Sequence, residues 1–147
     1  MRENCIFCEI VKRSAPASVV YDDEICLAFM DINPINAGHV LVIPKAHFVT
    51  LEDCDGVVAK HLMLAMKMLN KAVQTATRCE GILNEIMNGE AAGQEIFHLH
   101  IHVVPRNRGD GFGWHFPKGY RENVTPQELL YEIASKIGQH VSQINAL

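Results

Sequence analysis

Three histidines alternate with bulky aliphatic residues in one short stretch, His98-Leu99-His100-Ile101-His102. Successive side chains of a β-strand point to opposite faces, so the alternation predicts a strand with all three imidazoles on one face. Neighbouring imidazoles would then lie roughly 6–7 Å apart, which is two strand rises. Rings at that spacing can surround one phosphoryl group or share a metal ion.

Imidazole is suited to phosphoryl or nucleotidyl transfer because its charge changes in the physiological pH range. A neutral histidine can attack phosphorus, while a protonated neighbour stabilises charge or donates to a leaving group. The central residue, His100, is therefore the candidate to contact phosphorus, with His98 and His102 beside it. The alternative is an exposed sheet face that carries histidines by chance, but packing gives no reason for three in register.

The loop before this stretch, residues 88–94, contains two glycines and begins and ends with the amides Asn88 and Gln94. Glycines such as Gly93 allow backbone N–H groups to approach an anion closely. An ordinary hairpin loop is the alternative reading. Next to three histidines, the loop indicates a phosphate-binding segment.

The elements that must position these residues can be read from periodicity and turn signals. Strands are predicted over residues 19–21, 25–31, 39–43, 82–87 and 96–104. A long helix is expected to begin at the capping box Thr50-Leu51-Glu52-Asp53 and to end at Gly81. A C-terminal helix begins after Thr125, with a buried face formed by Leu130, Ile133, Ile137 and Val141. Hairpin strands with two helices indicate an α+β domain with an antiparallel sheet.

The composition fits one domain spanning residues 1–147 with a single core. No apolar run approaches the ~18 residues of a membrane span, and the first residues lack the apolar segment of a secretory signal. A net charge of −4 without a basic block argues against nucleic-acid binding. Five cysteines, an odd number, predict no disulfide framework and a cytoplasmic location.

Cys5 and Cys8 form a CxxC pair that could bind zinc. A structural zinc site needs four ligands, and without a second CxxC the other two must be histidines, for which His47 and His98 are candidates. A reduced pair without metal is the alternative, and no βαβ pattern supports a redox role. The other cysteines are expected to be small buried or half-buried residues: Cys26, Cys54 and Cys79. The other histidines are expected to be packing or surface residues: His39, His61, His115 and His140.

The stretch 98–104 matches His-φ-His-φ-His-φ-φ, where φ is apolar, and by this motif the chain resembles the histidine triad superfamily. Residues 29–34, 38–45 and 88–105 also resemble that family in order and spacing. The resemblance covers about residues 4–117 and leaves residues 118–147 as a C-terminal helical extension. Within the superfamily the chain looks like the bacterial-type branch of the histidine triad nucleotide-binding proteins.

The resemblance implies a five-stranded antiparallel sheet and a homodimer with a continuous sheet. It implies binding of purine nucleoside monophosphates and hydrolysis at the α-phosphate, typically of phosphoramidates. His100 then aligns with a nucleophile that forms a nucleotidyl-histidine intermediate, His102 with a phosphate contact, and His98 with a residue that orients the site. Asp31 then aligns with the ribose-binding acid, and the walls of the base pocket align with Phe7, Phe29 and Ile32. Asn88 and Gln94 align with residues of the phosphate loop, and Trp114 resembles a tryptophan that reaches the partner subunit.

Glu95 departs from the family pattern, because many relatives carry Ser or Thr there. A carboxylate at this position predicts poorer handling of anionic leaving groups or a preference for cationic amines. Several bacterial relatives resemble this chain in a Cys-Cys-His-His zinc site, which implies structural zinc at Cys5, Cys8, His47 and His98. Other functions remain open: a dinucleoside polyphosphate hydrolase, a noncatalytic nucleotide-binding scaffold, or a zinc-storage or zinc-sensing protein.

Overall fold

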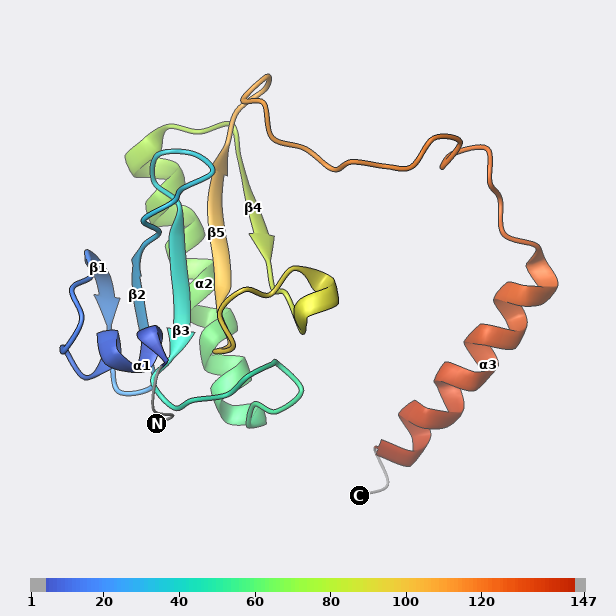
Figure 1. The fold of residues 1–147 in the computed structure, drawn as a ribbon, viewed down its shortest axis with the longest axis horizontal. Helices are drawn as coiled ribbons and strands as arrows, with labels where there is room; N and C mark the ends of the chain where they lie inside the picture. The colour runs from blue at the N-terminus through green and yellow to red at the C-terminus, as the bar shows by residue number, and fades with distance from the viewer. Residues whose placement is uncertain (1–4, 145–147) are drawn as a thin grey trace. The chain divides into compact units, whose positions relative to one another are not determined.

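The computed structural model describes residues 5–144 and confirms the predicted α+β class (Figure 1). Five strands form one antiparallel sheet in the order β1-β2-β3-β5-β4. The elements are α1 (Ile6–Val11), β1 (Val19–Asp22), β2 (Cys26–Met30), β3 (Val40–Pro44), α2 (Gly56–Thr77), β4 (Gly81–Glu85), the 3-10 turn η1 (Glu90–Ala92), β5 (Ile101–Arg106) and α3 (Gln127–Ile144).

Helices α2 and α1 lie on opposite faces of the sheet (Figure 1). The central strand β3 shows why: Val40 and Val42 pack into the core beneath α2, while Leu41 and Ile43 pack with residues of α1. A strand covered on both faces reads as a continuous apolar run rather than as an alternation. The sheet thus has two cores, and the chemistry of each face depends on which helix covers it.

The long helix α2 was predicted with the wrong boundaries. Thr50 and Asp53 do interact, through the Thr50 N–H and the Asp53 carboxylate 3.1 Å apart, but they close a turn before the helix. Asp55 is the N-cap, and its carboxylate accepts from Val57 N at 2.7 Å. The helix ends at Thr77 and is capped by Arg78, which adopts a left-handed conformation with φ 57°. Gly81 therefore opens β4 instead of ending the helix.

The predicted fifth strand is displaced toward the C-terminus. β5 begins at Ile101, where pairing with β3 starts, and runs through Pro105 instead of stopping there. Before it, Leu99 N donates to Phe48 O at 2.7 Å, so the main chain pairs with a loop rather than with a strand. Only His102 lies in the regular strand, and His98 and His100 precede it in non-strand backbone.

A second compact unit begins at Gly113 and contains α3. The prediction of a buried face on this helix is wrong for the described chain, because no α3 residue is buried. Ile137 and Val141 are 59% and 50% exposed. Apolar residues at this spacing are typical of a helix that packs against a partner, and the described residues do not cover them. Among residues 5–144, no helix is long and apolar enough to cross a membrane.

Position 38, just before His39, requires a glycine because of its backbone conformation and because a side chain has no space there. Its φ is +100°, and an added Cβ would overlap with Thr77 Cγ2 of α2. We expect Gly38→Ala to lower the free energy of unfolding by about 1–3 kcal/mol, measured by urea denaturation. The control is Gly56→Ala, where nothing lies within 4 Å of the new Cβ and the change should stay within about 0.5 kcal/mol. Equal losses in the two variants would contradict this account.

Candidate functional site

The three imidazoles share one face, as the alternation predicted, and in the structure this is the α1 side of the sheet. Phe7 of α1 packs edge-on against the rings of His98 and His100, with centroids 5.8 and 5.4 Å away. His102 continues the row, with its ring 4.9 Å from that of His100. The intervening Leu99 and Ile101 are buried in the opposite core, beneath α2. One extended segment therefore separates a reactive face from a structural one.

The hydrogen bonds of His100 select one tautomer. Its Nδ1 lies 2.6 Å from the main-chain oxygen of His98, and a carbonyl can only accept, so Nδ1 carries the hydrogen. Burial lowers the pKa of His100, although the bond to His98 acts in the opposite direction. The ring is thus neutral near pH 7 and keeps the lone pair on Nε2. A neutral, oriented Nε2 is a nucleophile suited to phosphorus.

His102 is oriented by a second histidine, His39. Ile35 N donates to His39 Nδ1 at 3.3 Å, and His39 Nε2 lies 2.9 Å from His102 Nδ1. Burial lowers the pKa of His39, so its ring is neutral and its Nε2–H donates to His102. This leaves the hydrogen of His102 on Nε2, a buried atom without a hydrogen-bond partner among the described residues. Such a donor costs about 1–3 kcal/mol if it stays unpaired, and it suits an oxygen of a bound ligand.

His39 was missed by the sequence analysis, which grouped it with packing and surface residues. In the structure it is 1% exposed and lies between Asp31 and His102. Asp31 Oδ2 is 3.5 Å from His39 Nδ1, beyond ordinary hydrogen-bond reach, and its charge partly opposes the effect of burial on the pKa of His39. The signal was absent from the sequence, because the pairing of β3 with β5 cannot be read from local patterns.

The glycine loop is braced from within by Gln94, which is only 2% exposed. Its Oε1 accepts from Gly89 N at 2.8 Å, and its Nε2 donates to Val49 O at 2.6 Å. Asn88 Oδ1 accepts a hydrogen bond from Leu51 N at 2.9 Å, which connects the start of the loop to the segment before α2. Gly89 and Gly93 have φ of +90° and +92°, which non-glycine residues rarely adopt. The Gln94 side chain thus shapes the loop.

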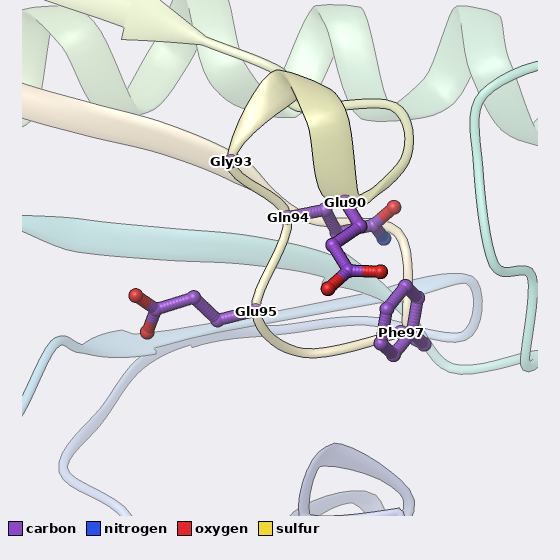
Figure 2. Close-up of a pocket in the computed structure, with 5 residues that line it drawn as sticks. All are labelled: Glu90, Gly93, Gln94, Glu95 and Phe97. Carbon is purple, nitrogen blue, oxygen red and sulfur yellow. The ribbon is translucent and has the colours of Figure 1, made fainter.

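A pocket of about 390 Å³ lies on this loop (Figure 2). It brings together three residues named in the sequence analysis, Gly93, Gln94 and Glu95, with Glu90 and Phe97. The Phe97 ring is 46% exposed, and both glutamates are exposed. Figure 2 shows the Glu95 carboxylate pointing away from Glu90 and Phe97, but a pocket lined by two acidic side chains and an aromatic ring still favours a cationic group over an anionic one.

The other residues predicted to contact the nucleotide differ in how deeply they are buried. Phe7 and Phe29 are buried and pack edge to face, with centroids 5.4 Å apart. Asp31 accepts from Asn33 N at 2.8 Å, whereas Ile32 between them is 91% exposed. Trp114, which is 72% exposed, belongs to the second unit.

The two cysteines and two histidines of the predicted metal site come together, with their ligand atoms within 4.8 Å of one another. His98 Nδ1 lies 3.5 Å from Cys5 Sγ, 3.7 Å from Cys8 Sγ and 3.2 Å from His47 Nδ1. Cys8 Sγ and His47 Nδ1 are 3.4 Å apart. In a tetrahedral zinc site with ordinary bond lengths, such ligand atoms are about 3.3–3.8 Å apart. The donor set and spacing therefore fit zinc.

The tautomer of His98 agrees with this fit. Its Nε2 lies 2.9 Å from Pro44 O, so Nε2 carries the hydrogen and the Nδ1 lone pair points at the cysteines. Histidines that bind metals usually donate their other ring N–H to a carbonyl or carboxylate in this way. Burial lowers the pKa of His98 to about 4, which keeps the ring neutral.

A second group of ligand-type side chains, Asp23, Cys26 and His61, has a different character. Asp23 Oδ2 lies 2.7 Å from both His61 Nε2 and the Tyr21 hydroxyl. These are hydrogen-bond distances, shorter than the spacing of ligands around a metal. The group ties the β1–β2 hairpin to α2.

Comparison with known proteins agrees with the fold and the histidine row. Residues 12–109 match the HIT domain, so the chain belongs to the HIT, or histidine triad, family of nucleotide-binding hydrolases and transferases. It is similar to a HIT family protein structure from Bacillus subtilis, with 38% identity, TM-score 0.84, and 93% and 96% of the two chains covered.

Two further relatives bear on the site. Adenylylsulfatase HINT3 from Arabidopsis thaliana is 37% identical over 98% of this chain and 73% of its own length. A zinc-bound histidine triad family protein from Mycobacterium smegmatis has 37% identity and TM-score 0.72, covering 81% of this chain and 86% of its own.

The buried histidines predict acid sensitivity. Burial lowers the pKa of His102 to about 4, with His100 and His39 acting in the same direction and Asp31 against it. Between about pH 6.5, the value in an unfolded chain, and pH 4, the unfolded state binds a proton that the folded state does not. The free energy of unfolding should therefore fall as the pH falls through this range.

Urea denaturation across that range measures the effect. His102→Asn, which keeps a polar side chain but cannot titrate, should fall less steeply than the wild type. Identical pH dependence in the two proteins would show that His102 is not held neutral by the fold.

Proposed function

We propose that this protein hydrolyses nucleoside phosphoramidates of the AMP-amine type, with purine nucleoside monophosphate as the bound product. The observation that carries the proposal is the pair of fixed tautomers, with a lone pair on His100 Nε2 and a hydrogen on the adjacent His102 Nε2. The lone pair can attack phosphorus, and the adjacent N–H can donate a hydrogen bond to one of the phosphoryl oxygens.

In the first step, His100 Nε2 attacks the α-phosphorus and the phosphorus–nitrogen bond breaks. The amine leaves with the bonding electron pair and takes a proton from solvent. Positive charge on the nucleotidylated ring is stabilised through Nδ1–H by the main-chain oxygen of His98. His102 Nε2–H donates to a phosphoryl oxygen. Water then attacks the phosphorus, which releases the nucleoside monophosphate and a proton and restores His100.

The nucleoside would be held by residues around the end of β2. Phe7 and Phe29, with the exposed Ile32, would provide apolar contacts for a purine base. Asp31 would accept hydrogen bonds from ribose hydroxyls. The amide NH2 of Asn88 would donate to the phosphate, while Gly89 and Gly93 shape the loop beside it, because their N–H groups donate within the loop to Gln94 Oε1 and Glu90 O.

The acidic pocket bears on the leaving group. Glu90, Glu95 and Phe97 line it, and two carboxylates favour an amine-bearing or cationic leaving group over sulfate or a polyphosphate. Adenylyl sulfate is nevertheless a second candidate substrate, because one relative is named an adenylylsulfatase. A dinucleoside polyphosphate hydrolase is disfavoured by the same repulsion, and a noncatalytic nucleotide-binding scaffold would leave the two fixed tautomers without a use.

We also propose that Cys5, Cys8, His47 and His98 bind structural Zn²⁺. The ligand spacing and the zinc-bound relative support this assignment. Bound zinc would attach α1 to the histidine segment and supply no reacting group.

A homodimer with a continuous sheet is part of the proposal. β4 is an edge strand whose five residues are all partly exposed, so its free edge can pair with a second copy. The exposed apolar stripe of α3 offers further contact area, and Trp114 would reach the partner subunit's pocket. A cytoplasmic location is also part of the proposal, and it rests on the odd number of cysteines, which predicts no disulfide framework.

Brief reaction with an adenosine phosphoramidate should add one nucleotidyl group to the protein mass when the reaction is quenched without acid. His100→Ala should remove the adduct and lower turnover by at least about 10³-fold, because the nucleophile is lost, while AMP binding is retained. His140→Ala, an exposed histidine of α3, is the matched control and should react normally.

Retained turnover in His100→Ala would refute the assigned nucleophile. Parallel assays with adenylyl sulfate and a diadenosine polyphosphate rank the leaving groups, and we expect the phosphoramidate to react with the highest kcat/KM. If none of the three substrates is turned over while AMP still binds, the hydrolase proposal fails and the scaffold reading is favoured.

Elemental analysis of the purified protein should find about one zinc per chain. Cys5→Ala should lose the metal and melt at a lower temperature, since a metal that binds only the folded state stabilises it. Cys54→Ala, which removes a cysteine outside the cluster, should keep the zinc. A wild-type protein that contains no zinc and binds none on titration would overturn the assignment.

A further inference from the structure

His98 takes part in both clusters of the α1 face. Its ring Nδ1 faces Cys5, Cys8 and His47, at 3.2–3.7 Å. Its main-chain oxygen accepts the Nδ1–H of His100 at 2.6 Å. The same residue is thus a member of the Cys–His centre and the group that sets the tautomer of the candidate nucleophile. Among residues 5–144, no other residue makes both of these contacts.

Helix α1 makes a second connection between the two clusters. Cys5 and Cys8 come from the start of this helix, and Phe7 lies between them in the sequence. The Phe7 ring is edge-on to the His100 ring, with centroids 5.4 Å apart and planes at 85°. α1 has only six residues, too few for a helix to be stable by itself, so tertiary contacts must hold it in place.

We propose that metal binding at Cys5, Cys8, His47 and His98 positions His100 for attack, so that the Cys–His centre is a positioning element of the active site. The proposal rests on the proposed function for its consequence in catalysis. His98 is the positioning residue, and it acts through its carbonyl oxygen on the His100 ring.

The physical argument concerns what holds His98 in place. Its ring is fixed at Nε2 by Pro44 O, and at Nδ1 by the Cys–His centre. A cation among the converging lone pairs draws them together. When the cation is removed, protons must take its place on sulfur or nitrogen, and the four side chains separate. His98 can then turn about its remaining bond, and its carbonyl and Phe7 shift together.

A small shift is enough to matter at His100. The bond to His98 O is what keeps the hydrogen on Nδ1, and without it the ring can adopt the other tautomer, in which Nε2 carries the hydrogen and cannot attack. Misplacement of a reacting group by about 1 Å can cost about 10²-fold in rate. Phe7 is only one of the groups proposed to hold the nucleotide, and Phe29 and Asp31 lie outside the metal centre, so nucleotide affinity should change less than the rate.

The test compares the zinc-loaded protein with the same protein after treatment with a chelator, and with Cys5→Ser. Nitrogen-15 NMR of labelled histidines reports the tautomer of His100, which is assigned by its absence in His100→Ala. We expect a single Nδ1–H tautomer with zinc and a mixture without it. We expect the rate of nucleotidylation to fall about 10- to 100-fold, with AMP affinity changed by less than about threefold. Adding back Zn²⁺ alone to the chelated wild type should restore both.

The control is Val73→Ala, a buried α2 residue in the core on the other face of the sheet. It should lower the melting temperature by creating a cavity yet leave the His100 tautomer and the nucleotidylation rate unchanged. All comparisons are made well below the melting temperature of each protein. If Cys5→Ser does not fold, the chelated wild type and His47→Asn carry the test.

An unchanged His100 tautomer and rate in the metal-free protein would overturn the proposal and leave the centre a purely structural site. Equal effects of Val73→Ala on tautomer and rate would also overturn it. If the wild type forms no nucleotidyl-histidine, the proposed function fails, but the NMR comparison still decides whether the metal sets the tautomer.

Discussion

A buried imidazole is stabilised when its N–H faces an acceptor, and three histidines of the α1 face find one within the protein, whereas His102 keeps its N–H for a ligand. For His98 the acceptor is Pro44 O, for His100 it is His98 O, and for His39 it is His102. Each choice fixes which nitrogen keeps a lone pair. The lone pair of His98 is thereby directed to the cysteines and that of His100 is left for chemistry. The main-chain carbonyls of Pro44 and His98 thus decide which ring nitrogens are reactive.

The two cores of the domain explain why the row can exist. Leu99, Ile101 and Val103 are buried beneath α2 and hold the segment to the sheet. Apolar burial on that face stabilises the strand, so the opposite face can carry imidazoles without weakening the fold. α1 then covers the imidazoles with Phe7, which lowers the local dielectric constant and keeps the rings neutral.

The sequence was sufficient for the fold class, the number of strands and the common face of the histidines, because these follow from local periodicity. It was insufficient for details that depend on pairing between distant segments. The role of His39 requires β3 to lie beside β5, and the start of β5 depends on Leu99 bonding to Phe48. The C-terminal stripe around Ile137 was read correctly as an apolar face, but its burial cannot follow from periodicity alone, since that requires a partner.

The electrostatics of the site favour a substrate with little charge. The histidines are neutral, and the residues proposed to touch the phosphate offer N–H groups rather than lysine or arginine. Such dipoles can stabilise the single negative charge of a phosphoramidate diester-like centre. They are less able to hold a polyphosphate with several charges, and Glu90 and Glu95 would repel one further. The absence of cationic side chains among these groups also leaves the amine side of the substrate free of repulsion. The tautomers thus support the proposed attack on phosphorus, and the charge pattern supports the proposed leaving group.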